Sequence, residues 1–171
     1  MIFKTIIKKF KLLKDPIGYW RNHGVRIGNN CSIFSTVSFG SEPYLVSVGD
    51  NVRITNNVQF ITHDGGVWVL RNMYPELSDI DVFGRITVGN NVHIGPDTVI
   101  MPGCSIGNNC IIGVGSIVTK DIPDNSIAVG VPAKVIKSID EYKKKNESRF
   151  EHTKKMGKDE KKAYLIDKYL D

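Results

Sequence analysis

Aliphatic residues recur at every sixth position through the second half of the chain: Val88, Ile94, Ile100, Ile106, Ile112 and Val118. The fourth residue after each of them is mostly small. Neither the 3.6-residue period of a helix nor the two-residue period of a single strand produces this spacing. A coil of three short strands joined by three turns does, with one aliphatic side chain per strand pointing inward. The pattern therefore predicts a mainly β fold, a parallel β-helix with a triangular core.

Polar pairs separate the inward positions, and the same frame begins earlier, at Ile27. Asparagine tolerates the left-handed backbone that tight corners need. We therefore expect the corners at Asn29-Asn30, Asp50-Asn51, Asn56-Asn57, Asn90-Asn91 and Asn108-Asn109. The three cysteines, Cys31, Cys104 and Cys110, all occupy the small slot of the repeat, and no CxxC is present. They are interpreted as core side chains rather than as nucleophiles, a disulfide framework or a zinc site.

Three segments follow from where the repeat starts and stops. Residues 27–136 form the coil, and residues 1–26 are spaced for an amphipathic helix with a lysine face, its apolar side provided by Phe3, Ile6, Ile7, Phe10 and Leu13. Residues 137–171 form a charged helical tail. Insertions at 39–47 and 62–85 break the period, and we expect them to leave the coil as loops. Loops on a rigid repeat often carry function.

Charge is distributed unevenly along the 171 residues, although the net charge of +5 is modest. Residues 1–26 carry +6, residues 27–133 carry −5 and residues 134–171 carry +4. Because the body is acidic and the basic ends lack interleaved aromatic residues, nucleic-acid binding is not expected. The uncharged stretch 98–119 holds a proline and several glycines, so it is not a membrane span. Lysines interrupt the N-terminus, which excludes a signal peptide and predicts a cytoplasmic protein.

The repeat and its C-terminal sequence together resemble the hexapeptide-repeat acyltransferases. Residues 94–123, followed by Val129-Gly130-Val131-Pro132-Ala133-Lys134-Val135-Ile136, are similar to the signature of the maltose/galactoside and capsular-polysaccharide O-acetyltransferase branch. The resemblance implies a left-handed β-helix and a homotrimer with active sites between subunits. It also implies acetyl-CoA as the donor, no metal, and a histidine as general base.

His63 is the histidine that this resemblance selects, because it stands where the long insertion leaves the coil. Neutral imidazole has a pKa suited to removing a proton from a hydroxyl near pH 7. Glu42, in the first insertion, is the candidate to hold the second ring nitrogen. No arrangement for a covalent acyl-enzyme is evident in the sequence, so direct transfer in a ternary complex is the simpler mechanism.

Similarity to the family also indicates where the donor binds. The expected contacts with acetyl-CoA are His93, Pro96, Val114, Thr119, Lys120, Lys134 and Lys137, with the last two lysines near the phosphates. The chain departs from the family at His93, where tryptophan is common, and at Pro96, which has no N–H to donate to an oxyanion. Candidates for contact with a saccharide acceptor are Asp64, Trp68, Arg71 and Tyr74, although this insertion could equally pack between subunits.

Three other functions compete with a saccharide O-acetyltransferase. An N-acetyltransferase acting on a nucleotide-linked amino sugar would use the same base and the same donor. A non-catalytic β-helix scaffold would bind no acetyl-CoA. A zinc carbonic anhydrase built on similar coils needs three converging histidines, and only His63 and His93 lie within the repeats. The basic N-terminal helix also suggests peripheral contact with an anionic membrane.

Overall fold

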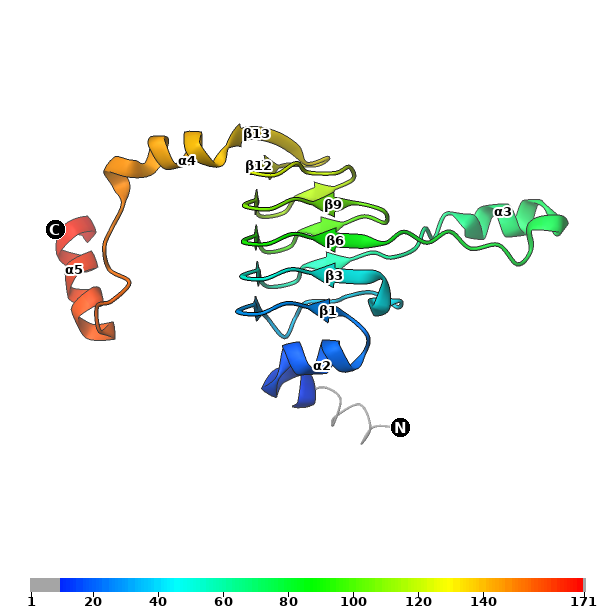
Figure 1. Cartoon of the computed structure of the whole chain (residues 1–171), viewed down its shortest axis with the longest axis horizontal. Helices are drawn as coiled ribbons and strands as arrows, with labels where there is room; N and C mark the ends of the chain where they lie inside the picture. Colours follow the sequence, from blue (N-terminus) through cyan, green and yellow to red (C-terminus); the bar gives the residue numbers. More distant parts are fainter. Residues whose placement is uncertain (1–9, 171) are drawn as a thin grey trace.

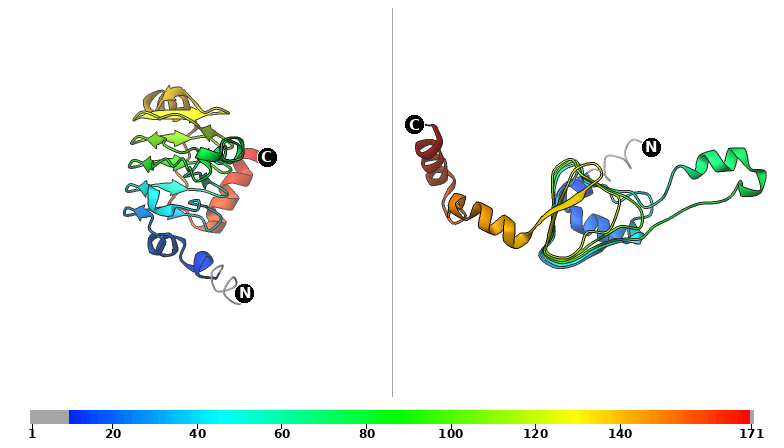
Figure 2. Two further views of the ribbon diagram at one scale, coloured as in Figure 1. Left: turned by 90° about the vertical axis from the view of Figure 1, so that its right-hand side faces the viewer. Right: turned by 90° about the horizontal axis from the view of Figure 1, so that it is seen from above.

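A computed structural model describes residues 10–170 and shows a coil of short strands that is triangular when viewed from above (Figures 1 and 2). Three sheets form its faces. Sheet A contains β1 (Arg26–Ile27), β3 (Val46–Val48), β6 (Ile86–Val88) and β9 (Ser105–Ile106). Sheet B contains β2 (Ser32–Ile33), β4 (Arg53–Ile54), β7 (His93–Ile94), β10 (Ile111–Ile112), β12 (Ser126–Val129) and β13 (Lys134–Ser138). Sheet C contains β5 (Gln59–Phe60), β8 (Val99–Ile100) and β11 (Ile117–Val118).

Successive coils stack in register, with the repeated aliphatic residues aligned. In sheet B, Ile54 pairs with Ile94 and Ile94 with Ile112, and all three side chains are fully buried. Among the strands of the described residues, every pairing is parallel except that of β12 with β13. Burying one such side chain stabilises the fold by about 1.5–3 kcal/mol. The prediction of a parallel β-helix with one inward aliphatic per strand is therefore confirmed for the coil.

The corners form as the polar pairs predict. The second residue of each pair lies in the left-handed region, with φ between 54° and 59°, at Asn30, Asn51, Asn57, Asn91 and Asn109. Asparagines in neighbouring coils also bond to one another, as where Asn91 Nδ2 donates to Asn109 Oδ1 at 2.9 Å. The corners are therefore joined from coil to coil by side chains as well as by backbone.

The cysteines occupy the core slots that the repeat assigns to them. Cys104 and Cys110 are buried, and burial is the main influence that raises the pKa of each thiol. Cys31 is half-buried, and its Sγ donates to the Gly49 carbonyl at 3.1 Å. These sulfurs act as small packing groups.

Helix α2 (Pro16–Asn22) closes the N-terminal end of the coil. Its Trp20 packs edge-on against Phe39, with ring centroids 5.1 Å apart. Residues 10–14 are also helical, but the chain breaks at Asp15, whose side chain caps α2, so residues 10–26 are not one continuous helix. Phe3, Ile6 and Ile7 lie outside the described residues. No helix within residues 10–170 is both long enough and apolar enough to cross a bilayer.

The C-terminal end of the coil differs from the simple continuation of the repeat. After β12 the chain reverses through Gly130, at φ 100°, and β13 pairs antiparallel with β12. The tail then forms α4 (Ile139–Asn146), η3 (Glu147–Arg149) and α5 (Lys158–Leu170), which extend away from the coil (Figures 1 and 2). Within residues 10–170 the helices contain more residues than the strands, because each strand holds only two to five residues. The mainly β prediction therefore holds for the coil alone.

Both insertions leave the coil at the corner between sheets C and A, here called the C–A corner. The first contains η1 (Pro43–Leu45), and the second contains α3 (Val67–Met73) and η2 (Pro75–Leu77), which project outward (Figure 2). The first insertion follows coil one and the second follows coil two. Their bases are therefore neighbours, although about twenty residues separate them in sequence.

Candidate active site

His63 stands at the C–A corner, where the second insertion begins. It forms an isolated antiparallel bridge with Phe83, at the insertion's other end. The pairing continues on either side, because Asp64 N–H donates to the Val82 carbonyl and Gly84 N–H donates to the Thr62 carbonyl, both at 2.9 Å. The two limbs of the insertion are thus joined at their base, and this pairing fixes the backbone that carries His63.

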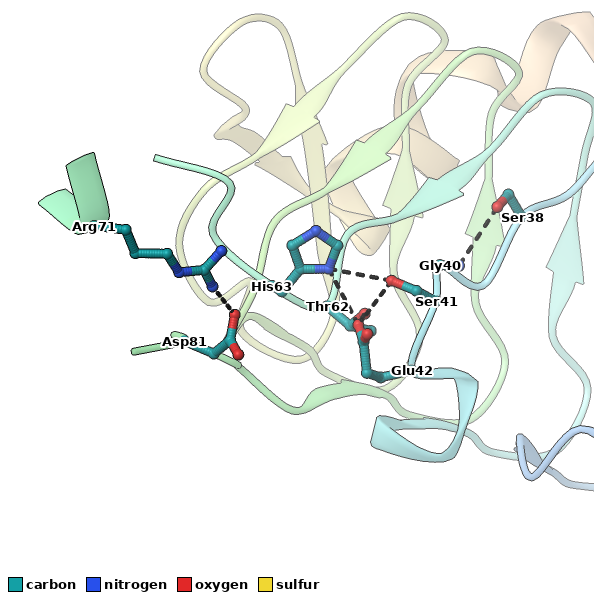
Figure 3. Close-up of polar contacts among 8 residues, drawn as sticks. All are labelled: Ser38, Gly40, Ser41, Glu42, Thr62, His63, Arg71 and Asp81. Atoms are coloured by element: carbon teal, nitrogen blue, oxygen red, sulfur yellow. Dashed lines mark hydrogen bonds and ion pairs between the residues drawn. The ribbon is translucent and has the colours of Figure 1, made fainter. Parts of the chain in front are cut away.

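Glu42 reaches the same place from the first insertion. Its Oε2 lies 3.1 Å from His63 Nδ1 and accepts hydrogen bonds from Thr62 Oγ1 at 2.6 Å and Ser41 Oγ at 3.0 Å (Figure 3). Ser41 Oγ also lies 3.2 Å from His63 Nδ1. The structure therefore brings together the two residues expected to form the catalytic pair, and it adds two hydroxyls for which the sequence analysis gave no role.

The contact with Glu42 determines which nitrogen of His63 is free. A carboxylate only accepts hydrogen bonds, so the proton between the two groups belongs to Nδ1 and the lone pair is on Nε2. The Thr62 hydrogen bond is the largest influence that lowers the pKa of Glu42, and bonds from His63 and Ser41 act in the same direction against partial burial. The side chain of His63 is 45% exposed and that of Glu42 17%. An ionised and largely covered carboxylate therefore holds an imidazole whose Nε2 is accessible.

Ser41 is not activated by this histidine, although it lies beside the ring. A serine nucleophile needs an imidazole lone pair to take its proton. Ser41 faces Nδ1, which carries a proton, and its own hydroxyl donates to Glu42. A serine–histidine contact that the sequence did not reveal therefore exists, but its geometry does not support an acyl-enzyme.

The residues expected to bind acetyl-CoA fall into three groups. Pro96, Val114 and Lys134 lie at the corner between sheets B and C, here called the B–C edge. Gly115 N–H donates to the Pro96 carbonyl at 2.8 Å, which joins the turns that carry Pro96 and Val114. Lys134 pairs with Val129, which lies at the same corner in the coil above Val114. Val114 is 70% exposed, so this edge presents an apolar surface. These three residues therefore share one edge of the coil.

The other expected donor residues lie elsewhere. Thr119 and Lys120 follow β11 at the C–A corner, above the coil that carries His63. His93 lies on sheet B, where burial first and the Arg53 charge second lower its pKa. Lys137 is in β13 on the same sheet. Within one chain, His63 and His93 are therefore on different faces of the coil, and the structure does not bring them together.

The candidate acceptor residues are divided between solvent and the insertion's own fold. Trp68 and Tyr74 are exposed by 67% and 42%. Arg71 instead pairs with Asp81 and donates to the Ile80 carbonyl at 2.7 Å, which ties the two limbs together (Figure 3). Asp64 accepts from Gly66 N–H at 2.8 Å and shapes the turn before α3. Within residues 10–170, no cluster of three or more His, Cys, Asp or Glu side chains could hold a metal ion.

Comparison with known proteins identifies the family. Residues 85–120 match the family described as bacterial transferase hexapeptide, six repeats. Protein CapG of Staphylococcus aureus is 49% identical over 170 residues, which cover 98% of this chain and 95% of CapG. The chain belongs to the hexapeptide-repeat transferases. It is accordingly an acyltransferase.

Two further relatives are galactoside acetyltransferases. The galactoside O-acetyltransferase of Escherichia coli K12 is 38% identical over 132 residues, 77% of this chain and 63% of that protein. A galactoside acetyltransferase solved in complex with coenzyme A is 29% identical, with a TM-score of 0.58, over 83% of this chain and 82% of that one. The chain therefore spans nearly all of CapG but under two thirds of the E. coli enzyme.

Proposed function

We propose that this chain is an acetyl-CoA-dependent O-acetyltransferase that acts on a saccharide, with His63 as the general base. The observation that carries the proposal is the Glu42–His63 contact of 3.1 Å at the C–A corner, which leaves Nε2 accessible. Membership of the hexapeptide-repeat family supports acetyl transfer. The galactoside enzymes among the relatives support a sugar acceptor.

Direct transfer follows from the geometry of the pair. His63 Nε2 removes the proton of the acceptor hydroxyl as its oxygen attacks the thioester carbonyl, and Glu42 stabilises the resulting imidazolium. Collapse of the tetrahedral intermediate breaks the carbon–sulfur bond. The proton then passes from Nε2 to the leaving thiolate, which releases CoA and restores neutral His63.

The donor lies along the B–C edge in this proposal. The pantetheine arm packs on Pro96 and Val114, and Lys134 provides a positive charge for the phosphates. Lys137, His93, Thr119 and Lys120 supply further contacts from the neighbouring face and corner.

A homotrimer with left-handed coils completes the site. The B–C edge and the C–A corner lie at opposite ends of sheet C in one chain. A donor held on the B–C edge therefore meets His63 when these two corners come from neighbouring copies.

The protein works in the cytoplasm, where acetyl-CoA is available. Its N-terminal segment, with exposed Phe10 and Leu13 beside lysines, contacts anionic membrane, which cosedimentation with anionic vesicles at low salt would test.

A panel of acceptors tests the function. Purified protein is mixed with acetyl-CoA and free sugars, oligosaccharides or nucleotide-linked amino sugars, and release of the CoA thiol is followed. Acetylation of a sugar hydroxyl, located by mass spectrometry and NMR, is the expected result. Acetylation only of an amine would replace the proposal with the N-acetyltransferase, and absence of acetyl-CoA binding would favour the scaffold.

A further inference from the structure

Thr62 places a buried hydroxyl directly behind the proposed catalytic pair. It immediately precedes His63, so strand alternation turns its side chain toward the interior while His63 faces outward. Thr62 is fully buried, and its Oγ1 lies 2.6 Å from Glu42 Oε2. A buried hydroxyl of this kind requires a hydrogen-bond partner. Here that partner is a carboxylate from a different insertion.

The oxygen that Thr62 holds is the one that contacts the imidazole. Glu42 Oε2 accepts from Thr62 Oγ1 and lies 3.1 Å from His63 Nδ1 (Figure 3). Glutamate has three rotatable side-chain bonds, whereas threonine is stiff at its first torsion. The short bond to a rigid, buried residue therefore fixes where the carboxylate oxygen stands.

Gly40 allows the first insertion to pass closely over Thr62. Its φ is +71°, in the left-handed region. A Cβ at this position would lie 2.8 Å from the Phe60 carbonyl oxygen and 2.9 Å from Thr62 Oγ1. A residue with a side chain would therefore push against the hydroxyl that holds Glu42. The path of the first insertion beside Thr62 therefore depends on the absence of a side chain at position 40.

We propose that Thr62 is a positioning residue for the His63 base, acting through Glu42. The inference rests on the proposed function, because it assigns a role within that reaction. The Thr62 hydroxyl keeps Glu42 Oε2 on the Nδ1 side of the ring. The imidazole then stays in the tautomer and orientation that present Nε2 to the acceptor. Thr62 contacts neither substrate, so its loss reduces turnover without weakening binding.

Steady-state kinetics of Thr62→Val test the proposal, because valine keeps the shape and removes the hydroxyl. We expect kcat to fall about tenfold, in line with the sensitivity of catalysis to small displacements, while both KM values stay within about twofold. Thr62→Ser, which retains the donor, should restore most of kcat. In a Glu42→Ala background, Thr62→Val should change kcat by less than about twofold, because the partner is already absent.

Ser126→Ala is the matched control for the loss of a buried hydroxyl. Ser126 is also buried, and its Oγ donates to the Asp124 carbonyl at 3.1 Å, at the corner between sheets A and B. This variant should lower thermal stability and leave kcat unchanged. If Thr62→Val fails to fold, Thr62→Ala removes the hydroxyl without steric demand and should give the same loss of kcat.

The kinetics of these variants separate this inference from the function on which it rests. If His63→Ala is inactive while Thr62→Val or Thr62→Ala stays within twofold of the unchanged protein, the role of Thr62 is overturned and the proposed mechanism stands. Equal losses from Thr62→Val with and without Glu42 would also overturn it. Full activity of His63→Ala would instead overturn the mechanism itself.

Discussion

Glu42→Gln removes the charge beside His63 and keeps the size of the side chain. In the transition state His63 carries a positive charge, and Glu42 Oε2 lies 3.1 Å from its Nδ1. The His63 side chain is 45% exposed, so the pair is partly screened by water. At 3.1 Å, Coulomb's law gives about 1.3 kcal/mol at the dielectric constant of water and about 2.7 kcal/mol at half that value.

These energies correspond to a loss in kcat of about 10- to 100-fold. Thiol release from acetyl-CoA with the best acceptor measures kcat and both KM values. The KM for acetyl-CoA should stay within about twofold, because Glu42 faces the Nδ1 side of the His63 ring and is not among the proposed donor contacts. Glu147→Gln makes the same chemical change on exposed η3 and should leave kcat unaltered. A Glu42→Gln enzyme that is folded and retains more than half of kcat would refute the proposed role of the carboxylate.

Three further predictions concern the corner, the donor edge and the tail. Gly40→Ala should lower the free energy of unfolding by about 2–4 kcal/mol in denaturant melts, because alanine is strained in the left-handed region and its Cβ overpacks the corner. Gly157→Ala, which has open space around it, is the control. Equal effects of the two substitutions would contradict the reasoning. Lys134→Ala should raise the KM for acetyl-CoA about three- to tenfold at unchanged kcat, whereas Lys158→Ala should not; an unchanged KM would remove Lys134 from the donor site. Hydrogen bonds from Lys168, Tyr164 and Tyr169 lower the pKa of Glu151 from 4.5 to about 2. The contacts of α5 with Glu151 should therefore be complete above pH 4.5 and be lost progressively as the pH falls toward 2. Tyrosine NMR shifts that stay constant from pH 6 to pH 2 would argue against this.

The coil could be predicted from the sequence because its signal is periodic and local. Residues such as Ile94 and Ile112 stand eighteen positions apart and pair directly. The asparagine pairs mark corners because their side chains tolerate the left-handed backbone. Beyond the end of the repeat, the six-residue pattern no longer predicts the path of the chain. Val131 and Val135 are still aliphatic but lie outside the six-residue frame, because Gly130 reverses the chain and β13 runs antiparallel.

The catalytic pair could be predicted in part. The interruptions of the repeat indicated where His63 and Glu42 leave the coil, and both interruptions lie at the C–A corner. Thr62 and Ser41 were missed because their roles depend on a contact between two insertions, which no local pattern records. One signal was available for Thr62. Alternation after buried Phe60 turns position 62 inward, and a buried threonine needs a partner.

The proposed donor site was the least predictable part, because the residues expected to form it lie on different faces and corners of the coil. Pro96 and Val114 lie in equivalent turns of neighbouring coils, so the repeat itself brings them together. His93 belongs to sheet B, and no residue pattern indicates what this side chain contacts in the assembled site. In the proposed trimer the site is shared between subunits, and no local spacing in the sequence encodes such packing.

Turnover by His63→Ala is the measurement that tests the central claim most directly. His152→Ala, in the exposed tail, is the matched histidine control, and thermal melts confirm that both variants fold. With the acceptor identified, we predict that His63→Ala lowers kcat by 10²–10⁴, as removal of a general base does, while acetyl-CoA still binds. A folded His63→Ala protein that loses less than about tenfold in kcat would contradict the account.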